Sequence, residues 1–267
     1  MSPTAPLTNE RDVIVYKAKL AEQAERYDEM AESMKELVRT AAKDTPLTVE
    51  ERNLLSVAFK NAVGARRASL RIINSLENKQ RQRAQLEYVE ITKAYQQKVT
   101  EELSTICEDI IQLLQEHLLQ SVEEDVEAQV FYWKMKGDYY RYLCEFAGEA
   151  NKAKATEAAK EAYERATDIA AKELNATHPV RLGLALNYSV FHYEILSHPE
   201  IACQIAKSAF DDAISQLESV DEESYRDSTL IMQLLRDNLT LWTTDAETAA
   251  AAVAPAAPVA VEPEAEK

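Results

Sequence analysis

The sequence predicts an all-α protein, and three observations support this prediction. Only 4 of the 267 residues are glycine and 8 are proline, although sheets need these residues at frequent turns. Apolar residues recur at spacings of three and four along most of the chain, which is the period of an amphipathic helix. Two His-Pro pairs and a capping sequence mark places where helices start. We therefore expect long helices joined by a few loops.

The first helical region is expected over about residues 16–40, and the second starts near residue 49. Apolar residues follow one helical face through the first region, at Leu20, Ala24, Tyr27, Met30, Met34 and Leu37. Thr48 is followed three residues later by Glu51, which is the spacing of a capping box. An apolar run follows directly, so a long helix is expected from this box to about Lys79.

Prolines and changes in polarity divide the rest of the chain into further amphipathic segments. A proline restrains the residue before it away from helical geometry, so each His-Pro pair is expected to separate two helices. Self-similarity at the 34-residue period of tetratricopeptide arrays is not found. The expected helices cover about 83–120, 125–149, 151–175, 179–197, a segment after His198-Pro199, and a last one, about 224–243, that ends near Trp242.

One helical domain is expected over residues 11–244. Residues 1–10 precede the periodic pattern and are expected to be flexible. Residues 245–267 are rich in Ala, Pro and Glu and carry five acidic residues against the single Lys267. Such a composition cannot bury enough apolar surface to fold, so a disordered acidic tail is predicted there.

The overall charge argues against nucleic-acid binding, because phosphate backbones require a basic face. The chain has 46 Asp and Glu against 30 Lys and Arg, a formal net charge of −16.

The three cysteines of the chain are widely separated and form no C-x-x-C, so neither a zinc site nor a disulfide framework is indicated. We expect an intracellular protein with reduced thiols, in the cytoplasm, with the nucleus as a second compartment left open. The start of the chain has no signal peptide, and the longest apolar run is interrupted by prolines, so membrane insertion is not expected.

Enzyme signatures are absent from the sequence. The isolated glycines cannot form G-x-G-x-x-G, a P-loop or G-x-S-x-G. The four histidines form no H-E-x-x-H, and no glutamate precedes a histidine by three residues. We predict no catalytic residue, no metal ligand and no cofactor.

Two helices each present a line of cations. At 100° per residue, Lys134, Asp138, Arg141 and Glu145 fall within about 60° of one another, with Tyr142 at the edge. Lys60, Arg67 and Arg71 fall within about 40° on the earlier helix. Such stripes are most often solvated faces. Arginine also suits a bidentate grip on phosphate, so these two stripes could bind one anion together, with Asp138 and Glu145 holding the guanidinium groups when the site is empty.

Two further helices carry asparagine on otherwise apolar faces. Asn187 shares a face with Val190 and Glu194, and Asn238 shares one with Leu230, Leu234 and Leu241. Leucines at this spacing are normally core residues. An asparagine among them needs a partner for its amide, and the backbone of an extended peptide would supply one.

At this point the sequence closely resembles the 14-3-3 proteins. The resemblance covers roughly residues 10–244 in the order that the family has, and it implies about nine antiparallel helices that dimerise and form one amphipathic groove per subunit. It also implies an adaptor without catalytic activity that binds phosphoserine or phosphothreonine segments of client proteins in signalling. The matching stretches are LAEQAERYDEM at 20–30, ERNLLSVAFKNAVGARRASLR at 51–71, KMKGDYYRYL at 134–143, HPVRLGLALNYSVF at 178–191 and DSTLIMQLLRDNLTLW at 227–242.

The resemblance assigns roles to individual residues by motif position. Lys60, Arg67 and Arg141 would grip the phosphate, with Tyr142 donating from its hydroxyl and Arg71 nearby. Asn187 and Asn238 would hold the client backbone, helped by Glu194. The apolar wall of the groove would consist of Leu186, Val190, Leu230, Leu234, Leu241 and Trp242.

A dimer interface is implied in the same way, with this chain or a paralogue as the partner. Leu20 and Ala24 of one subunit would pack against Ser69, Ile73 and Tyr95 of the other. Arg26 with Glu102, and Glu29 with Lys98, would form ion pairs between the subunits. The alternative function class is a tetratricopeptide-like scaffold that binds unmodified peptides, against which the absence of a repeat and the presence of two arginine stripes count.

Overall fold

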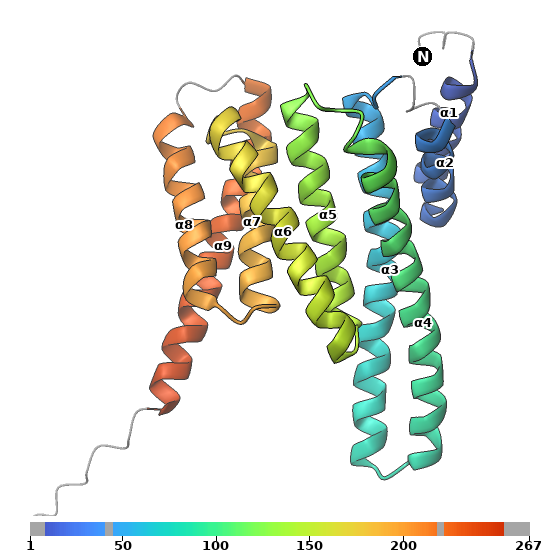
Figure 1. The fold of residues 1–267 in the computed structure, drawn as a ribbon. Helices are drawn as coiled ribbons and strands as arrows, with labels where there is room; N and C mark the ends of the chain where they lie inside the picture. Colours follow the sequence, from blue (N-terminus) through green and yellow to red (C-terminus); the bar gives the residue numbers. More distant parts are fainter. Residues whose placement is uncertain (1–8, 41–44, 218–221, 254–267) are drawn as a thin grey trace, which may run out of the picture.

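The computed structural model describes residues 9–40, 45–217 and 222–253, and in these the chain is all-α, as the sequence predicts. The helices run up and down side by side, with α3 and α4 forming the longest hairpin and α5 to α9 standing next to it (Figure 1). No strand occurs in the described part of the chain. The helices are α1 (Glu10–Gln23), α2 (Tyr27–Thr40), α3 (Val49–Gln82), α4 (Leu86–Leu113), α5 (Val126–Phe146), α6 (Glu149–Glu173), α7 (Pro179–Glu194), α8 (Pro199–Gln216) and α9 (Glu222–Val253), and a π-helical turn, η1 (Leu114–Leu118), continues α4.

The helix starts that the sequence marks are confirmed. The backbone N–H of Glu51 donates to Oγ1 of Thr48 at 3.3 Å, and the backbone N–H of Thr48 donates to Oε2 of Glu51 at 2.8 Å. These two bonds form the predicted capping box at the start of α3. Pro179 and Pro199 each occupy the first turn of a helix, where a missing N–H costs nothing.

The region 16–40 is two helices and not one. α1 ends at Gln23 and α2 starts at Tyr27, and between them Glu25 has a φ of 54°. The backbone N–H of Arg26 donates to the carbonyl of Ala21 at 2.9 Å, which closes the turn. The apolar spacing continues across this turn because both helices pack on the same core, so periodicity does not reveal the break.

The ends of the domain also differ from the prediction. Asn9 caps α1 by accepting from the backbone N–H of Asp12 at 2.8 Å, so the helix already begins at Glu10, within the segment 1–10 that was expected to be flexible. α9 is described as far as Val253, past the expected start of the disordered tail at residue 245. Residues 1–8 and 254–267, which hold the rest of these two predictions, lie outside the described residues.

The core consists of three groups of buried side chains that meet at α5 and α7. The first joins α1 to α5 and includes Leu55 and Tyr132, the second joins α5 to α7 around Tyr163, and the third joins α7 to α9 around Leu235. All four of these side chains are fully buried. Because α5 contributes to two groups and α7 to two, these helices are fixed on both sides.

In the part of the chain that the structure describes, three turns place a residue other than glycine in the left-handed region of backbone space. Glu25, Ala84 and Ser197 have φ values of 54°, 54° and 56°, and they follow α1, α3 and α7. This conformation costs a residue with a Cβ roughly 1–2 kcal/mol. The scarcity of glycine therefore leaves local strain at three helix ends.

We predict that Ser197→Gly stabilises the protein by about 1 kcal/mol, because glycine adopts this φ without the steric cost. The backbone N–H of His198 already donates to the carbonyl of His192 at 2.9 Å, so the turn itself is retained. The midpoint of chemical unfolding measures the change. Ala153→Gly, at an exposed position inside α6, is the matched control and should lower stability by about 1 kcal/mol. A Ser197→Gly variant less stable than the unaltered chain would contradict this explanation.

Candidate functional site

A cavity of about 280 Å³ opens between α3, α5 and α7 and is lined by members of both predicted cation stripes. α3 contributes Lys60, α5 contributes most of the wall, and α7 contributes Asn187. The helix spacing explains this arrangement, since residues three, four and seven apart share one face. The lining residues are Ser56, Lys60, Phe131, Lys134, Met135, Asp138, Tyr139, Arg141, Tyr142 and Asn187.

The structure brings Arg67 of α3 and Arg141 of α5 together. Nε and Nη2 of Arg67 donate to the two carboxylate oxygens of Glu145 at 2.9 and 2.6 Å. Nη1 of Arg141 lies 3.9 Å from the same carboxylate. The ring of Tyr142 also lies against both guanidinium groups, with its centroid 4.4 Å from Cζ of Arg67 and 4.6 Å from Cζ of Arg141. Two cations from different helices therefore share one carboxylate and one aromatic ring.

The other two predicted phosphate-binding cations are more exposed. Lys60 lines the cavity and is exposed, and it lies on the same face of α3 as Arg67, about two turns earlier. Arg71 lies one turn further along α3, is exposed and does not line the cavity. Lys60 is thus a direct contributor to the site, and Arg71 lies at its margin.

Asp138 is buried at the centre of the hydrogen-bond network of the site. Its Oδ1 accepts from the hydroxyl of Tyr163 at 2.6 Å and from Nδ2 of Asn187 at 2.8 Å, and its Oδ2 accepts from Nζ of Lys134 at 2.9 Å. Nη2 of Arg141 lies 3.6 Å from Oδ1. Burial by itself would raise the pKa of Asp138, but the charges of Lys134 and Arg141 and the hydrogen bond from Tyr163 keep this pKa below its usual value. The carboxylate therefore stays ionised and fixes groups from three helices.

Tyr163 was not among the residues predicted for the site, and Lys134 was noted only as part of a stripe. Nε of Arg141 donates to the hydroxyl of Tyr163 at 3.2 Å, so this phenol connects Arg141 to Asp138. The sequence does contain a trace of this role, because Tyr163 is a large residue among the buried alanines of α6. It fits there because it faces Gly137, where a Cβ atom would lie 2.8 Å from the Tyr163 ring.

The predicted apolar wall is divided between exposed and buried residues. Leu230, Leu234 and Leu241 on α9 are 65%, 45% and 57% exposed. Leu186 and Val190 on α7 are partly buried against the third core group. Trp242 is buried and stacks on Tyr193 at 4.7 Å between ring centroids, so it supports the wall from behind.

The predicted backbone-binding residues lie on the same two helices. Asn187 is partly buried, and its amide is engaged with Asp138. Asn238 is partly buried on α9, and Glu194 is exposed at the last residue of α7. Asn187 thus borders the cation site directly, while the other two lie further along the helices.

The residues predicted for a dimer interface lie on α1 to α4 and are mostly exposed. Leu20 and Tyr95 are 55% and 57% exposed, and Ala24, Ser69 and Lys98 are exposed too. Ile73 is instead part of the protomer's own core, and it is the neighbouring Ile72 that faces outward with 62% of its surface exposed.

Three of the four side chains predicted to pair between subunits, Arg26, Glu29 and Glu102, have partners within this protomer. Arg26 donates to Glu29, three residues later in the chain. Glu102 accepts from Nε of Arg66 at 3.3 Å. The pairs between subunits, Arg26 with Glu102 and Glu29 with Lys98, remain predictions.

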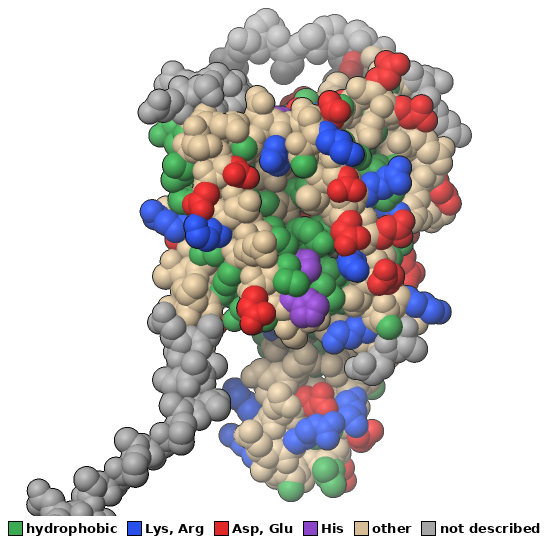
Figure 2. All heavy atoms as spheres, turned by 60° about the vertical axis from the view of Figure 1, so that its left-hand side comes forward, with side chains coloured by type: hydrophobic (Ala, Val, Ile, Leu, Met, Phe, Trp, Pro, Cys, Tyr) green, Lys and Arg blue, Asp and Glu red, His purple; other side chains and the backbone are tan. Residues whose placement is uncertain are grey.

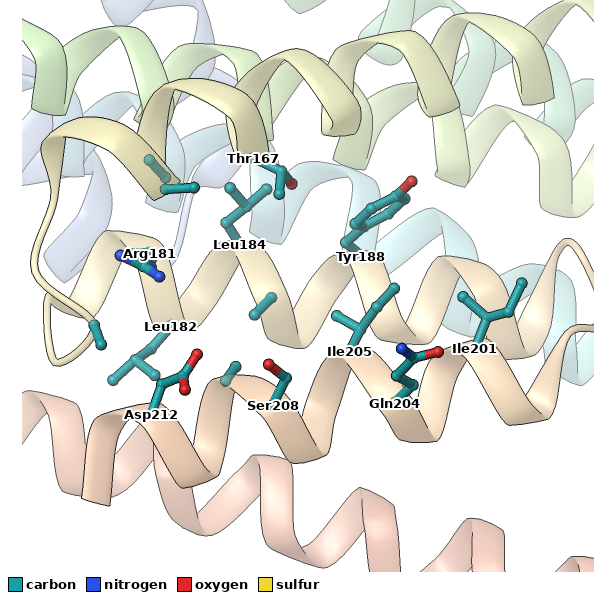
Figure 3. Close-up of a pocket in the computed structure, with 15 residues that line it drawn as sticks. Thr167, Arg181, Leu182, Leu184, Tyr188, Ile201, Gln204, Ile205, Ser208 and Asp212 are labelled. Atoms are coloured by element: carbon teal, nitrogen blue, oxygen red, sulfur yellow. The ribbon is translucent and has the colours of Figure 1, made fainter. Parts of the chain in front are cut away.

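A second cavity, of about 430 Å³, lies between α6, α7 and α8 (Figure 3). Its floor carries Leu184 and Tyr188 of α7, with Ile201 and Ile205 of α8 at one end. Figure 2 shows this side of the molecule, with apolar and histidine side chains gathered near its centre. Arg181 is the one cation among the described residues of its lining, and Nη1 of that residue donates to the carbonyl of Leu174 at 2.7 Å. This cavity therefore does not offer the converging cations of the first.

Other kinds of site are not found among the described residues. These contain no group of three or more His, Cys, Asp or Glu side chains placed to hold a metal ion. None of their helices combines the length and the apolar character needed to cross a bilayer.

A scan against protein-family models matches residues 17–243 to the family described as 14-3-3 protein. The chain belongs to the 14-3-3 family. It is 60% identical to a 14-3-3 protein of Eimeria tenella over 247 residues, which cover 89% of each chain. It is also 58% identical to the checkpoint signal transducer rad24 of Schizosaccharomyces pombe, over 92% of this chain and 89% of that one.

Family membership decides the function class. The 14-3-3 proteins are adaptors and not enzymes, so the prediction of an adaptor without catalytic activity is confirmed, and this chain is a signalling adaptor. The chain therefore does not belong to the tetratricopeptide-like scaffolds that were considered as the alternative.

We predict that Gly137→Ala lowers the stability of this 14-3-3 protein by about 1–3 kcal/mol, because its Cβ would overlap the ring of Tyr163 and move the phenol away from Asp138. Thermal or chemical unfolding measures the loss. Gly64→Ala in α3 is the control, because apart from the adjoining residues and backbone of its own helix no atom lies within 4 Å of its added Cβ, and it should be neutral or stabilising by up to about 1 kcal/mol. Equal effects of the two substitutions would show that the close approach of Tyr163 is unimportant.

Proposed function

We propose that this adaptor binds segments of client proteins that carry phosphoserine or phosphothreonine, and that the cavity between α3, α5 and α7 receives the phosphate. The observation that carries the proposal is the convergence of Arg67 and Arg141 on Tyr142 and Glu145, beside a cavity lined by Lys60. Guanidinium groups bind phosphate oxygens through two parallel hydrogen bonds. A phosphate held there would meet cations from two helices at once.

The surroundings of the cavity suit a charged group that arrives on a peptide. The chain as a whole carries a formal net charge of −16, so free anions are repelled unless a matching segment delivers them. Arg141 is 5% exposed, and burial strengthens its interaction with an anion because water screens it less. Burial by itself would lower the pKa of Arg141, but Tyr163, Tyr142 and Asp138 keep this pKa well above its usual value, so the guanidinium stays charged.

α7 and α9 supply the means to hold the rest of the segment. Asn187 and Asn238 offer amide groups for the N–H and C=O groups of an extended chain, with Glu194 nearby. Leu230, Leu234 and Leu241 remain exposed in the protomer and offer apolar contacts for client side chains. The proposed groove therefore combines a cationic end with an amide-bearing apolar wall.

The proposed partners are phosphorylated proteins whose activity, location or assembly changes when they are clamped or masked. Nucleic acid is not a proposed partner, because the acidic balance of the chain opposes it. The proposed compartment is the cytoplasm, with which three free cysteines in the described part of the chain are compatible.

We also propose that the protein acts as a dimer, through a surface made by α1, α3 and α4. Apolar side chains on these helices are exposed in the protomer although they are large: Val13, Tyr16, Leu20, Ile72, Leu76, Leu86, Tyr88, Ile91 and Tyr95. Such a set of exposed apolar residues is typical of a protein–protein interface. Either a second copy of this chain or a paralogue could cover it.

Calorimetric titration tests the phosphate proposal directly, with one synthetic peptide that carries either phosphoserine or serine at its centre. The phosphorylated form should bind, and Arg67→Ala or Arg141→Ala should weaken binding by about tenfold to more than a hundredfold, since a charge-assisted hydrogen bond contributes roughly 1.5–3 kcal/mol. Arg81→Ala, which removes an exposed arginine near the end of the same helix as Arg67, is the control and should change nothing. Equal affinities for the two peptides would refute the proposal.

Sedimentation tests the dimer. Leu20→Glu combined with Ile72→Glu should convert the protein to a monomer, because charged groups would be buried in the interface, while the fold survives since both side chains are largely exposed in the protomer. Ile201→Glu, at a 40% exposed position on α8, is the control and should leave the mass unchanged. An unaltered dimer in the double variant would place the interface elsewhere.

A further inference from the structure

The formal charges of the side chains around the cation cavity do not cancel. Four cations take part, namely Lys60, Arg67, Lys134 and Arg141, and two carboxylates compensate them, namely Asp138 and Glu145. At neutral pH this leaves a formal charge of about plus two within a protein whose total charge is strongly negative. A phosphate monoester dianion would neutralise this excess, whereas a carboxylate would neutralise only half of it.

The two carboxylates are held differently. Asp138 is fixed by Tyr163 and Asn187 from two neighbouring helices, so it cannot turn away without leaving polar groups unpaired. Among the described residues, Glu145 accepts hydrogen bonds from Arg67 alone, at 2.9 and 2.6 Å. The side chains of this pair are 20% and 15% exposed, so the pair can open at the surface of the protomer.

Glu145 therefore occupies the Nε–Nη2 donor pair of Arg67, with which this guanidinium could otherwise bind an anion. Nε and Nη2 of Arg67 both point to its carboxylate, and Nη1 of Arg141 lies 3.9 Å from the same Oε1 atom. Arg67 does not line the cavity, although its neighbours Tyr142 and Arg141 do. An anion that takes the Nε and Nη2 donors of Arg67 together must replace Glu145.

We propose that Glu145 is an internal counter-ion that makes the site select doubly charged over singly charged anions. This inference rests on the proposed phosphate-binding function. A carboxylate or another monoanion that displaced Glu145 would exchange one singly charged partner of Arg67 for another and gain little. A phosphate dianion brings a second charge for Lys60 and Arg141, so the exchange becomes favourable. The residue thus sets which anions, and not only which peptides, the groove accepts.

The test uses one synthetic peptide whose central residue is phosphoserine, the methyl ester of phosphoserine, or serine. The ester keeps the tetrahedral phosphate but carries one negative charge, so it separates charge from shape. Calorimetric titrations are made with the full chain at a pH of about 8, where the monoester is doubly charged. Each peptide is compared between the unaltered protein and Glu145→Gln, which keeps the shape of the side chain and removes its charge.

In the unaltered protein we expect phosphoserine to bind about a hundredfold more tightly than its methyl ester. In Glu145→Gln the ester should gain about tenfold or more and phosphoserine distinctly less, so that the ratio between them falls by about tenfold. Glu145→Asp, which restores the charge, should restore the ratio. An unchanged ratio in Glu145→Gln would overturn the proposal, and so would a loss of affinity for both anionic peptides, because Glu145 would then only support Arg67.

Two controls keep the result unambiguous. Asp211→Asn removes one negative charge from an exposed Lys–Asp pair on α8 and should leave the ratio as it is, which separates a local effect from a change in net charge. Melting curves of each variant show whether it is folded. If the ratio of the two affinities changed only in variants that had lost the fold, the proposal would be refuted. If the unaltered protein bound phosphoserine and serine equally, the proposed function itself would fail. A selective protein with an unchanged ratio in Glu145→Gln would refute only this inference.

Discussion

The cation site depends on the hydrogen bonds that the ionised carboxylate of Asp138 accepts. Asp138 is 7% exposed and bonds Lys134 on its own helix, Tyr163 on α6 and Asn187 on α7. Through Tyr163 it also supports Arg141, which is 5% exposed. A buried guanidinium without a partner would cost about 3–5 kcal/mol, so the fold could not keep Arg141 in this position without these neighbours. The polar network and the helix packing around it therefore stabilise each other.

The arrangement of the helices gives each side of the site a different task. α5 and α7 are fixed in the core on both sides, which makes them suitable for groups whose positions must not change. α3 packs on α5 and brings Arg67 to the Glu145 of that helix. α9 packs on α7 through Leu235 and Trp242 while it exposes Leu230, Leu234 and Leu241. A rigid cationic end is thereby joined to an apolar wall that is ready for contact.

The electrostatics of the site and of the whole chain have opposite signs. The chain's formal net charge of −16 weakens non-specific association with other anionic molecules. Inside the site, each cation is partly compensated by a carboxylate, which reduces the repulsion between guanidinium groups that would otherwise separate α3 from α5. These carboxylates lower the electrostatic free energy of the cation site. They are also the groups that an anion proposed to bind there would have to displace.

The sequence by itself determined the fold class, the capping box at Thr48, the helices that start at Pro179 and Pro199, and the two cation stripes, because all of these follow from local spacing. Its resemblance to a known family indicated which residues belong together. It did not reveal the turn at Glu25, since the apolar period continues across that turn. Composition also did not reveal that α9 reaches Val253, and the resemblance did not reveal that Ile73 packs in the protomer's own core. Only the tertiary structure decided that Arg67 engages Glu145, that Tyr163 joins Arg141 to Asp138, and that Gly137 makes room for the Tyr163 ring. These contacts connect residues 22 to 78 positions apart, and distances of that kind are set by helix packing and not by the local pattern of the chain.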